Sequence, residues 1–480
     1  INVYDVLVRT ACALTAVCLL GAEPAWAVST SSVSKSYIEA LEARITELEN
    51  KRSPTAGFAS GHFFIQSADG RFRLTPSLRL QVDAYMYQPQ FEALGQPRDQ
   101  VFLRRARPEL FGTLFGGAVQ FTLAGDFADA PNGVNATDIF LIFNVNPMLR
   151  IQVGQFDLPF SFENRTSDRY IEFMERSFVV RNLGTANKEP GVMVFGATPQ
   201  GHLHYAAGLF SGSGINVDDV DNNFDFVART FFRPWARDSV FDRVQIGGSF
   251  SVGERNRANQ AYLGGALPAG QGWLTTQSGY SFFFNPYAGA DGRDTRLAVV
   301  QDGTTVRVGG ELSAPIGPFS FRSEYIHVRA DTSENLLDAG VPLRGGGRLT
   351  ANGFYTLLSF WLFGDPRILP DAGVQGAPIF DATGKVPQSD LHLQLSARFD
   401  WVRAEYDPGT TLGTSQLGPS LVGGDYTFWD IAIGANLWWT RHIRFTANYV
   451  YNKIDGRVVN LPSPNQDFIH EIGLRAALAL

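Results

Sequence analysis

The sequence predicts an all-β fold, a transmembrane antiparallel β-barrel of about 16 strands with a short helix ahead of it. From about Gly61 to Leu480, apolar and polar residues alternate with a period of two, as expected for strands with one apolar and one polar face. Aromatic residues make up 13% of the 480-residue chain and glycine numbers 49, which suits strands, turns and aromatic girdles. Beyond the first 27 residues no apolar run approaches the roughly 18 residues of a membrane helix, so a membrane-spanning chain of this sequence has to be a barrel.

Residues 1–27 are expected to be a secretory signal peptide. The apolar run ACALTAVCLLGA follows Arg9, and Ala25-Trp26-Ala27 supplies a small-residue cleavage site. A buried helix or a membrane anchor is the alternative interpretation. The only cysteines, Cys12 and Cys18, lie in this run, so a processed chain has neither a disulfide framework nor a thiolate metal site.

Residues 28–60 are expected to be a periplasmic linker that carries a short helix. Ile38, Leu41, Ile45 and Leu48 are spaced 3, 4 and 3 residues apart, which is the seam of a coiled coil. Two heptads are too short to be stable alone. The helix is therefore either solvated on the linker or part of a coiled coil between protomers, and it offers a possible contact with the cell wall.

Residues 61–480 are expected to form the barrel. In the run that begins at Arg71, Leu74, Leu78 and Val82 share one face, whereas Arg73, Arg79 and Asp83 share the other. Similar alternation recurs in the runs 119–127, 391–400, 443–449 and 468–480. One face suits lipid and the other a water-filled lumen.

Short and long connections alternate along most of this region, as in bacterial barrels. The stretch from Ala330 to Ala351 is expected to be one of the long connections, and Gly364 to Asp390 is long where a short turn is expected. The connection from Asp157 to Glu189 is long and carries Phe160 and Phe173 among other apolar residues, so we expect it to fold into the barrel and constrict the pore.

Arginines on the inward face are the candidate functional residues. Rings of Arg at a constriction favour anions, because the guanidinium group stays charged and offers several donors to an oxyanion. The strand candidates come from two neighbouring strands, and the others lie in the connection 157–189: Arg73, Arg79, Arg105, Arg107, Arg165, Arg169 and Arg176. In the alternative interpretation, Asp83 and Glu109 neutralise the cluster and it braces the wall.

Other classes of function have little support. The seven His residues show no HExxH spacing, and no P-loop, nucleophile elbow or dinucleotide fingerprint occurs, so no catalytic residue, metal site or cofactor is expected. A net charge of -7 argues against a nucleic-acid partner.

Several motifs resemble the phosphate-selective porin O/P family. They are SADGRF at Ser67, RRAR at Arg104 followed by PELFGTLFG, GQFDLPFSFENRTSDRYIEFMERS from Gly154 to Ser177, and GFYTLLSFWLFGD from Gly353. The resemblance implies a 16-stranded, trimeric porin of the Gram-negative outer membrane, surrounded by lipid and lipopolysaccharide, whose third extracellular loop folds into the pore. The chain departs from the family in having only five Lys and in ending at Leu480.

The expected function is passive diffusion of small solutes with a preference for anions, phosphate or polyphosphate among them. One alternative is a sugar-type or general-diffusion porin with an inward aromatic path, formed by Phe140, Phe156, Phe231, Tyr355, Trp361 and Trp438. A barrel that serves mainly as an envelope tether is the other.

Overall fold

The computed structural model describes most of the chain from Thr55 onward. The described residues are 39–44, 55–59, 62–89, 98–128, 133–185, 187–216, 223–236, 240–255, 273–275, 281–283, 297–336, 341–363, 368–371, 374–378, 391–412, 423–440, 442–456 and 467–480. Two compact units divide the chain, Ile1–Ser53 and Pro54–Leu480. In the first unit residues 39–44 are helical. The expected signal peptide, residues 1–27, lies outside the described residues, and so does most of the linker.

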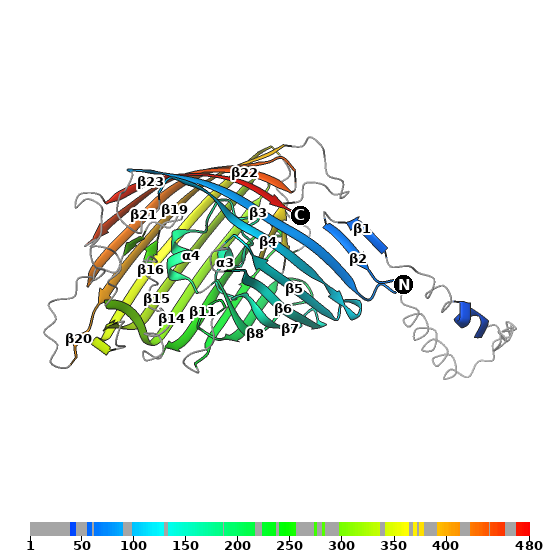
Figure 1. Cartoon of the computed structure of the whole chain (residues 1–480), viewed down its shortest axis with the longest axis horizontal. Helices are drawn as coiled ribbons and strands as arrows, with labels where there is room; N and C mark the ends of the chain where they lie inside the picture. The colour runs from blue at the N-terminus through cyan, green and yellow to red at the C-terminus, as the bar shows by residue number, and fades with distance from the viewer. Residues whose placement is uncertain are drawn as a thin grey trace. The chain divides into compact units, whose positions relative to one another are not determined.

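Sixteen antiparallel strands form a closed barrel, which confirms the predicted fold (Figure 1). The last strand pairs with the first, with Leu474 opposite Ala84, so the ring has no open edge. The barrel strands are β3 (Arg73–Gln88), β4 (Gln100–Leu114), β5 (Val119–Asp126), β6 (Asn135–Asn146), β7 (Leu149–Asp157), β8 (Lys188–Ala197), β9 (Leu203–Phe210), β10 (Asp225–Phe232), β11 (Gln245–Arg255), β14 (Leu297–Ile316), β15 (Phe319–Leu336), β16 (Val341–Phe363), β19 (His392–Asp407), β21 (Gly424–Trp438), β22 (Ile443–Gly456) and β23 (Phe468–Ala479).

Side chains alternate between the two sides of the wall, as the sequence period predicts. On β3, Ser77 and Arg79 face inward and are buried, whereas Val82 and Met86 face outward and are 43% and 40% exposed. Large exposed apolar side chains recur on the outer face of most barrel strands. This outer surface suits hydrocarbon and the inner surface suits water.

Short turns join several pairs of neighbouring strands. The turn between β4 and β5 is the 3-10 helix η1 (Phe115–Gly117), where Gly116 and Gly117 adopt φ of 70° and 96°. Such left-handed conformations favour glycine. The link from β16 to β19 contains a separate hairpin, β17 (Ile368–Asp371) with β18 (Val374–Pro378), and no additional barrel strand among its described residues.

One expected loop is mostly strand. Residues of β15 and β16 remain paired beyond Ala330, through Thr332 opposite Gly347 and on to Leu336 opposite Val341. The connection expected from Ala330 to Ala351 is therefore an extended hairpin, whose Gly347 and Arg348 occupy paired positions.

A second hairpin and three further short strands also lie outside the ring. The hairpin of β1 (Thr55–Ala59) and β2 (His62–Gln66) joins the start of β3, where Ile65 pairs with Leu74. Strand structure thus begins at Thr55, whereas the ring itself begins with β3 at Arg73. The others are β12 (Trp273–Thr275), which pairs with β13 (Ser281–Phe283), and β20 (Thr410–Thr411), which extends the sheet beside β16.

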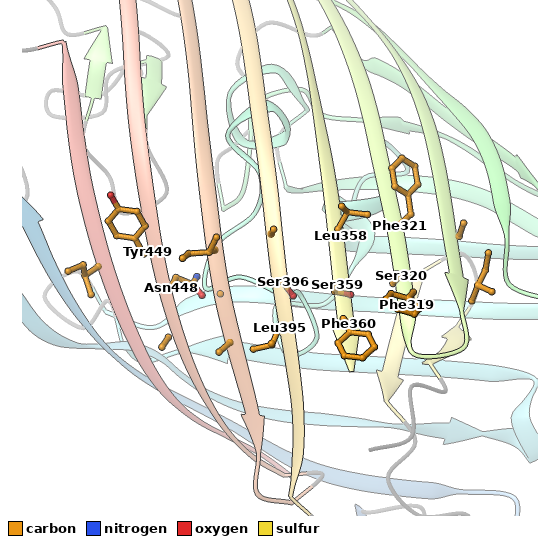
Figure 2. A pocket seen from close by; sticks show the side chains of 18 of the residues that line it. Phe319, Ser320, Phe321, Leu358, Ser359, Phe360, Leu395, Ser396, Asn448 and Tyr449 are labelled. Atoms are coloured by element: carbon orange, nitrogen blue, oxygen red, sulfur yellow. The ribbon is translucent and has the colours of Figure 1, made fainter. Parts of the chain in front are cut away.

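The outer wall is hollowed where small residues meet large ones. A shallow apolar depression with a cavity volume of about 1030 Å³ crosses the outer faces of β14 to β23 (Figure 2). Ala397 and Ala447 lie in it, and Leu358, Phe360 and Tyr449 rise around them. No charged side chain lines it. The depression therefore suits the apolar surroundings that the rest of the outer face requires.

Candidate functional site

The connection between β7 and β8, residues 158–187, lies inside the ring of strands, and we call it the inserted segment (Figure 1). It contains two short helices, α3 (Phe162–Arg165) and α4 (Phe178–Leu183). Phe160 and Phe178 are 0% exposed, and Phe173 is 1% exposed. Such aromatic burial explains why the segment packs inside the barrel and not in solvent.

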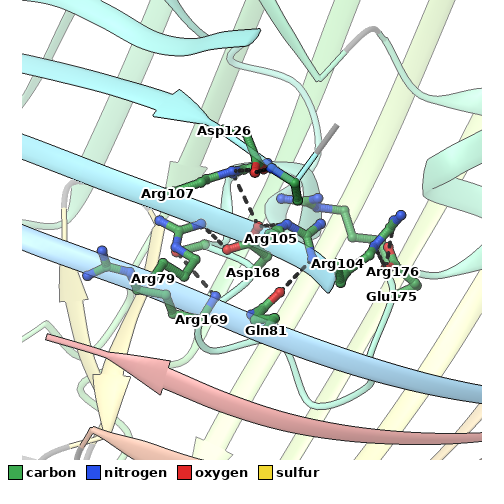
Figure 3. A network of polar contacts seen from close by, with 12 residues as sticks. Arg79, Gln81, Arg104, Arg105, Arg107, Asp126, Asp168, Arg169, Glu175 and Arg176 are labelled. Atoms are coloured by element: carbon green, nitrogen blue, oxygen red, sulfur yellow. Dashed lines mark hydrogen bonds and ion pairs between the residues drawn. The ribbon is translucent and has the colours of Figure 1, made fainter. Parts of the chain in front are cut away.

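Asp168, in the middle of the inserted segment, contacts three arginines of the barrel wall (Figure 3). Its carboxylate forms ion pairs with Arg79 of β3 and with Arg105 and Arg107 of β4. The Arg105 Nε to Asp168 Oδ2 distance is 2.6 Å, and the Arg107 Nη1 to Oδ2 distance is 3.5 Å. These three arginines form what we call the basic wall.

Further carboxylates flank the basic wall. Glu109 pairs with Arg79 at 2.6 Å and also with Arg169 of the inserted segment. Asp126 pairs with Arg107 at 2.5 Å, and Gln81 accepts a hydrogen bond from Arg105 at 2.7 Å. Arg79, Arg105 and Arg107, three of the four strand arginines expected to cluster, therefore lie together, and each of them has an acidic partner.

Carboxylates gather on the opposite side of the ring. Glu311, Glu324, Asp400 and Asp430 belong to one register row across β14, β15, β16, β19 and β21, with Tyr355 of β16 between Glu324 and Asp400. We call these four residues the acidic row. Glu324 accepts hydrogen bonds from the backbone N–H groups of Phe162 and Glu163 at 2.8 and 2.9 Å, at the start of α3.

The start of α4 is held by the acidic row in the same way. Asp400 accepts a hydrogen bond from the hydroxyl of Ser177 and another from the Val179 N–H at 3.3 Å. Unpaired N–H groups of a first helical turn are satisfied by such acceptors. The inserted segment thus spans the lumen, with Asp168 bound to the basic wall and two helix starts bound to the acidic row.

Buried arginines of β15, β19 and β23 lock the segment in place. Arg322 pairs with Glu172 at 2.5 Å and Arg398 with Asp400 at 2.7 Å. Their guanidinium groups lie over the rings of Phe162 and Phe173, at 4.8 and 4.7 Å from the centroids.

Arg475 of β23 links the last barrel strand to the first strand and to the inserted segment. Its guanidinium makes a bidentate ion pair with Asp83 of β3, both bonds being 2.7 Å, and donates to the Met174 carbonyl at 2.6 Å. Asp83 was one of the two acids expected to neutralise the basic cluster. It binds Arg475 because β23 lies next to β3 in the closed ring.

The carboxyl groups of the inserted segment differ from one another in the direction of their pKa shifts. Burial raises the pKa of Asp168, but Arg105, Arg79 and Arg107 outweigh burial and bring the net pKa well below its usual range. Burial also raises the pKa of Glu175, but Arg104, Arg105 and Arg475 together outweigh burial and lower the net pKa. Burial raises the pKa of Glu163 to about 7, although Arg398 and Arg322 lie nearby. The attachment to the basic wall is therefore ionised over the ordinary pH range.

The remaining candidate arginines have other contacts. Arg73 lies over the ring of Phe64, 4.3 Å from its centroid. Arg165 donates to the Asp157 carbonyl. Arg176 donates to the carbonyls of Glu163, Asn164 and Thr166 at 3.1, 3.3 and 2.9 Å. Arg165 and Arg176 thus hold the fold of the inserted segment, whereas Arg169 joins the cluster around Glu109.

The inward aromatic residues mostly pack against the inserted segment. Phe156 and Tyr355 are 1% and 0% exposed, and Trp438 stacks with Tyr170 of the segment at 6.5 Å. Rings that are covered in this way cannot form a stacking path for sugars. Among the described residues, no group of three or more His, Cys, Asp or Glu is placed to hold a metal ion, and no described helix is long and apolar enough to cross a membrane.

The fold defines a porin-type channel. It is a closed 16-strand barrel with an apolar outer wall and a polar lumen, and one segment folds across that lumen. The family model of phosphate-selective porin O and P matches residues 76–474, and the chain belongs to this family. It is 22% identical over 409 residues to Porin O of Pseudomonas aeruginosa PAO1, covering 82% of this chain and 86% of that one.

Solved structures share the fold. OmpT of Vibrio cholerae, in a trimer form, superposes with a TM-score of 0.52 at 10% identity, covering 85% of this chain and 99% of that one. The protein is thus a channel of the Gram-negative outer membrane for the diffusion of small solutes, a channel rather than an enzyme.

Proposed function

We propose that the channel favours anions, with phosphate and polyphosphate as candidate solutes, and that the inserted segment sets the width of its pore. One observation carries the preference. A small pocket between the inserted segment and β7 to β10 is lined by Arg150, Arg165, Arg229 and His204, with Phe195, Phe231 and other uncharged residues, and by no carboxylate.

The contacts of the arginines around this pocket support the proposal. Arg150 lies over the ring of Phe195 at 4.6 Å, and Arg233, close by on the same side, donates to Gln245 at 3.1 Å and lies over Phe231 at 5.2 Å. Among the described residues neither forms an ion pair with a carboxylate. Their charge therefore remains available to replace the hydration of a passing anion.

The reversal potential in a salt gradient across a planar bilayer tests this proposal. The wild-type channel should show anion preference, and Arg150→Ala combined with Arg233→Ala should move the potential toward cation preference. Arg403→Ala is the matched control, since Arg403 is 61% exposed on the outer wall. An unchanged potential in the double variant, or an equal change in the control, contradicts the proposal.

We also propose a homotrimer. Strands β5, β9 and β10 have 8 residues each, whereas a tilted strand needs about 9–11 to cross the hydrocarbon layer. Their outer faces are nevertheless apolar, with Leu123 and Leu209 46% and 53% exposed. A neighbouring protomer at this side would cover them. Crosslinking from a cysteine at position 209 should join protomers, and crosslinking from position 433 on β21 should not.

A further inference from the structure

The hairpin of β1 and β2 continues one edge of the barrel wall (Figure 1). Strand β4 pairs with one edge of β3 from Arg73 onward, whereas β23 pairs with the other edge only as far as Arg79. The part of this second edge that β23 leaves open is taken by β2, where Ile65 lies opposite Leu74. The hairpin therefore extends the sheet at the point where the last barrel strand ends.

The inner face of the hairpin packs against the barrel. The Arg73 guanidinium lies over the Phe64 ring, 4.3 Å from its centroid, and the His62 ring meets Phe111 of β4 edge-on at 5.5 Å. Gly57 of β1 lies so close to the Phe64 ring that a Cβ atom there would come within 2.9 Å of it. These contacts hold the hairpin in one orientation relative to β3.

The outer face of the hairpin is apolar and exposed. Phe58, Phe63 and Ile65 are 44%, 58% and 52% exposed, and the rings of Phe58 and Phe63 are in edge-to-face contact at 5.2 Å. Neither strand of the hairpin contains an Asp, Glu, Lys or Arg residue. An exposed apolar patch of this kind marks a surface for a protein or a membrane partner.

The patch is continuous with the lipid-facing wall of the barrel. Ile65 lies directly opposite Leu74, and directly opposed residues of paired strands share a face. Leu74 is an even number of residues from Val82, so both point outward from β3. Phe72 and Phe115 add two further exposed rings, whose centroids lie 5.5 Å apart. We call the five exposed residues the apolar rim: Phe58, Phe63, Ile65, Phe72 and Phe115.

Two features set the level of the apolar rim in the membrane. Among the described residues β1 pairs only with β2, so its other edge is open. An open strand edge is not stable in hydrocarbon, where no water can bond its N–H and C=O groups. Short turns such as η1, which carries Phe115, face the periplasm in bacterial barrels. Both features favour the boundary between headgroups and acyl chains on the periplasmic side.

A second copy of the chain is the other candidate partner, and the position of the hairpin disfavours it. β2 pairs with the edge of β3 that faces β23. The protomer contact proposed above involves β5, β9 and β10, which follow from the opposite edge of β3 through β4. The hairpin therefore lies away from that contact, beside wall that faces lipid.

We propose that the apolar rim binds the phospholipid surface of the periplasmic leaflet and anchors the start of the barrel there. The Phe58 and Phe63 side chains enter the boundary between headgroups and acyl chains, about 5–10 Å deep. The inner face, with Phe64 and His62, stays against the barrel. This anchor is independent of the anion preference of the pore.

A fluorescent label at position 63 of the full chain, reconstituted in phosphatidylcholine vesicles, tests the proposal. Cys12→Ser and Cys18→Ser remove the only native thiols, so Phe63→Cys carries a single nitrobenzoxadiazole label. Lipids with a nitroxide near the headgroup should quench this label at least about threefold more strongly than lipids with a nitroxide at the chain end, as expected for an interfacial depth. Aqueous iodide should quench it weakly.

Two further positions calibrate the result. Asp69→Cys lies in the exposed turn between β2 and β3, and its label should be quenched by iodide and little by either lipid. Val82→Cys lies on the outer wall of β3, and its label should be quenched most by the chain-end nitroxide. A label at position 63 that behaves like either of these overturns the proposal. So does a label at position 63 that neither iodide nor lipid quenches, together with crosslinking between protomers from that position, which would assign the rim to a second copy.

Discussion

Asp168 and Arg105 form an ion pair of 2.6 Å that joins the middle of the inserted segment to strand β4. The same carboxylate contacts Arg79 and Arg107, so one acid of the segment gathers three arginines of the wall. These arginines fix the position of the segment, and the Asp168 carboxylate partly neutralises their positive charge.

Asp168→Asn should loosen the inserted segment on this side. The amide cannot pair with three guanidinium groups, and each buried charge left without its partner is costly. Single-channel recordings should show larger and more variable conductance than wild type. Asp126→Asn is the control, because Asp126 pairs with Arg107 but does not belong to the segment. Identical recordings from both variants would count against the attachment.

Arg105→Ala combined with Arg107→Ala should shift the reversal potential toward cation preference. The change leaves the Asp168 carboxylate undercompensated in the lumen. Adding Asp168→Ala should then reverse most of the shift, since the uncompensated charge is gone. Low salt is required, because at about 1 M the Debye length falls to about 3 Å. A shift that Asp168→Ala leaves unchanged would show that the arginines act on the solute directly.

Acid should release the Asp168 attachment only at low pH. A carboxyl whose folded pKa is lowered contributes stability above its unfolded pKa of about 3.8 and loses it as pH falls toward the folded value. Conductance fluctuations should therefore appear below about pH 4 and match those of Asp168→Asn at neutral pH. Glu163, whose pKa is about 7, titrates in the opposite sense and gains stability on protonation. Loosening already near pH 7 would contradict this assignment.

Arg475→Ala should destabilise the closed barrel. Arg475 and Asp83 are both buried and bridge the last strand to the first, so removing the arginine leaves a buried carboxylate unpaired. The expected loss is about 3–5 kcal/mol. Urea unfolding in detergent micelles measures it, with Arg403→Ala as the exposed control. A loss below about 1 kcal/mol, the range of exposed ion pairs, would show that the bridge adds little.

Local sequence pattern was sufficient for the barrel and insufficient for its charge pairs. The alternation on β3 placed Arg79 and Met86 on the correct faces because side chains alternate along any strand. It could not pair Asp83 with Arg475, since their contact exists only once the ring closes. The extended hairpin of β15 and β16 was missed because its glycines and polar residues read as a loop.

The inserted segment shows the same limit. Its aromatic residues predicted burial, and Phe160 and Phe173 are indeed buried. Its acids and arginines are nearly balanced in number, however, so composition could not tell which of them pair with the wall. That choice depends on the path of the segment across the lumen, which places Asp168 at the basic wall and Ser177 at Asp400.

The central claim is that the inserted segment sets the width of the pore. Deleting Glu163 to Arg181 and measuring single-channel conductance tests it most directly, provided that the variant forms the same heat-resistant, β-rich barrel in detergent. The account predicts a conductance well above that of wild type. An unchanged conductance in a correctly folded variant would contradict it.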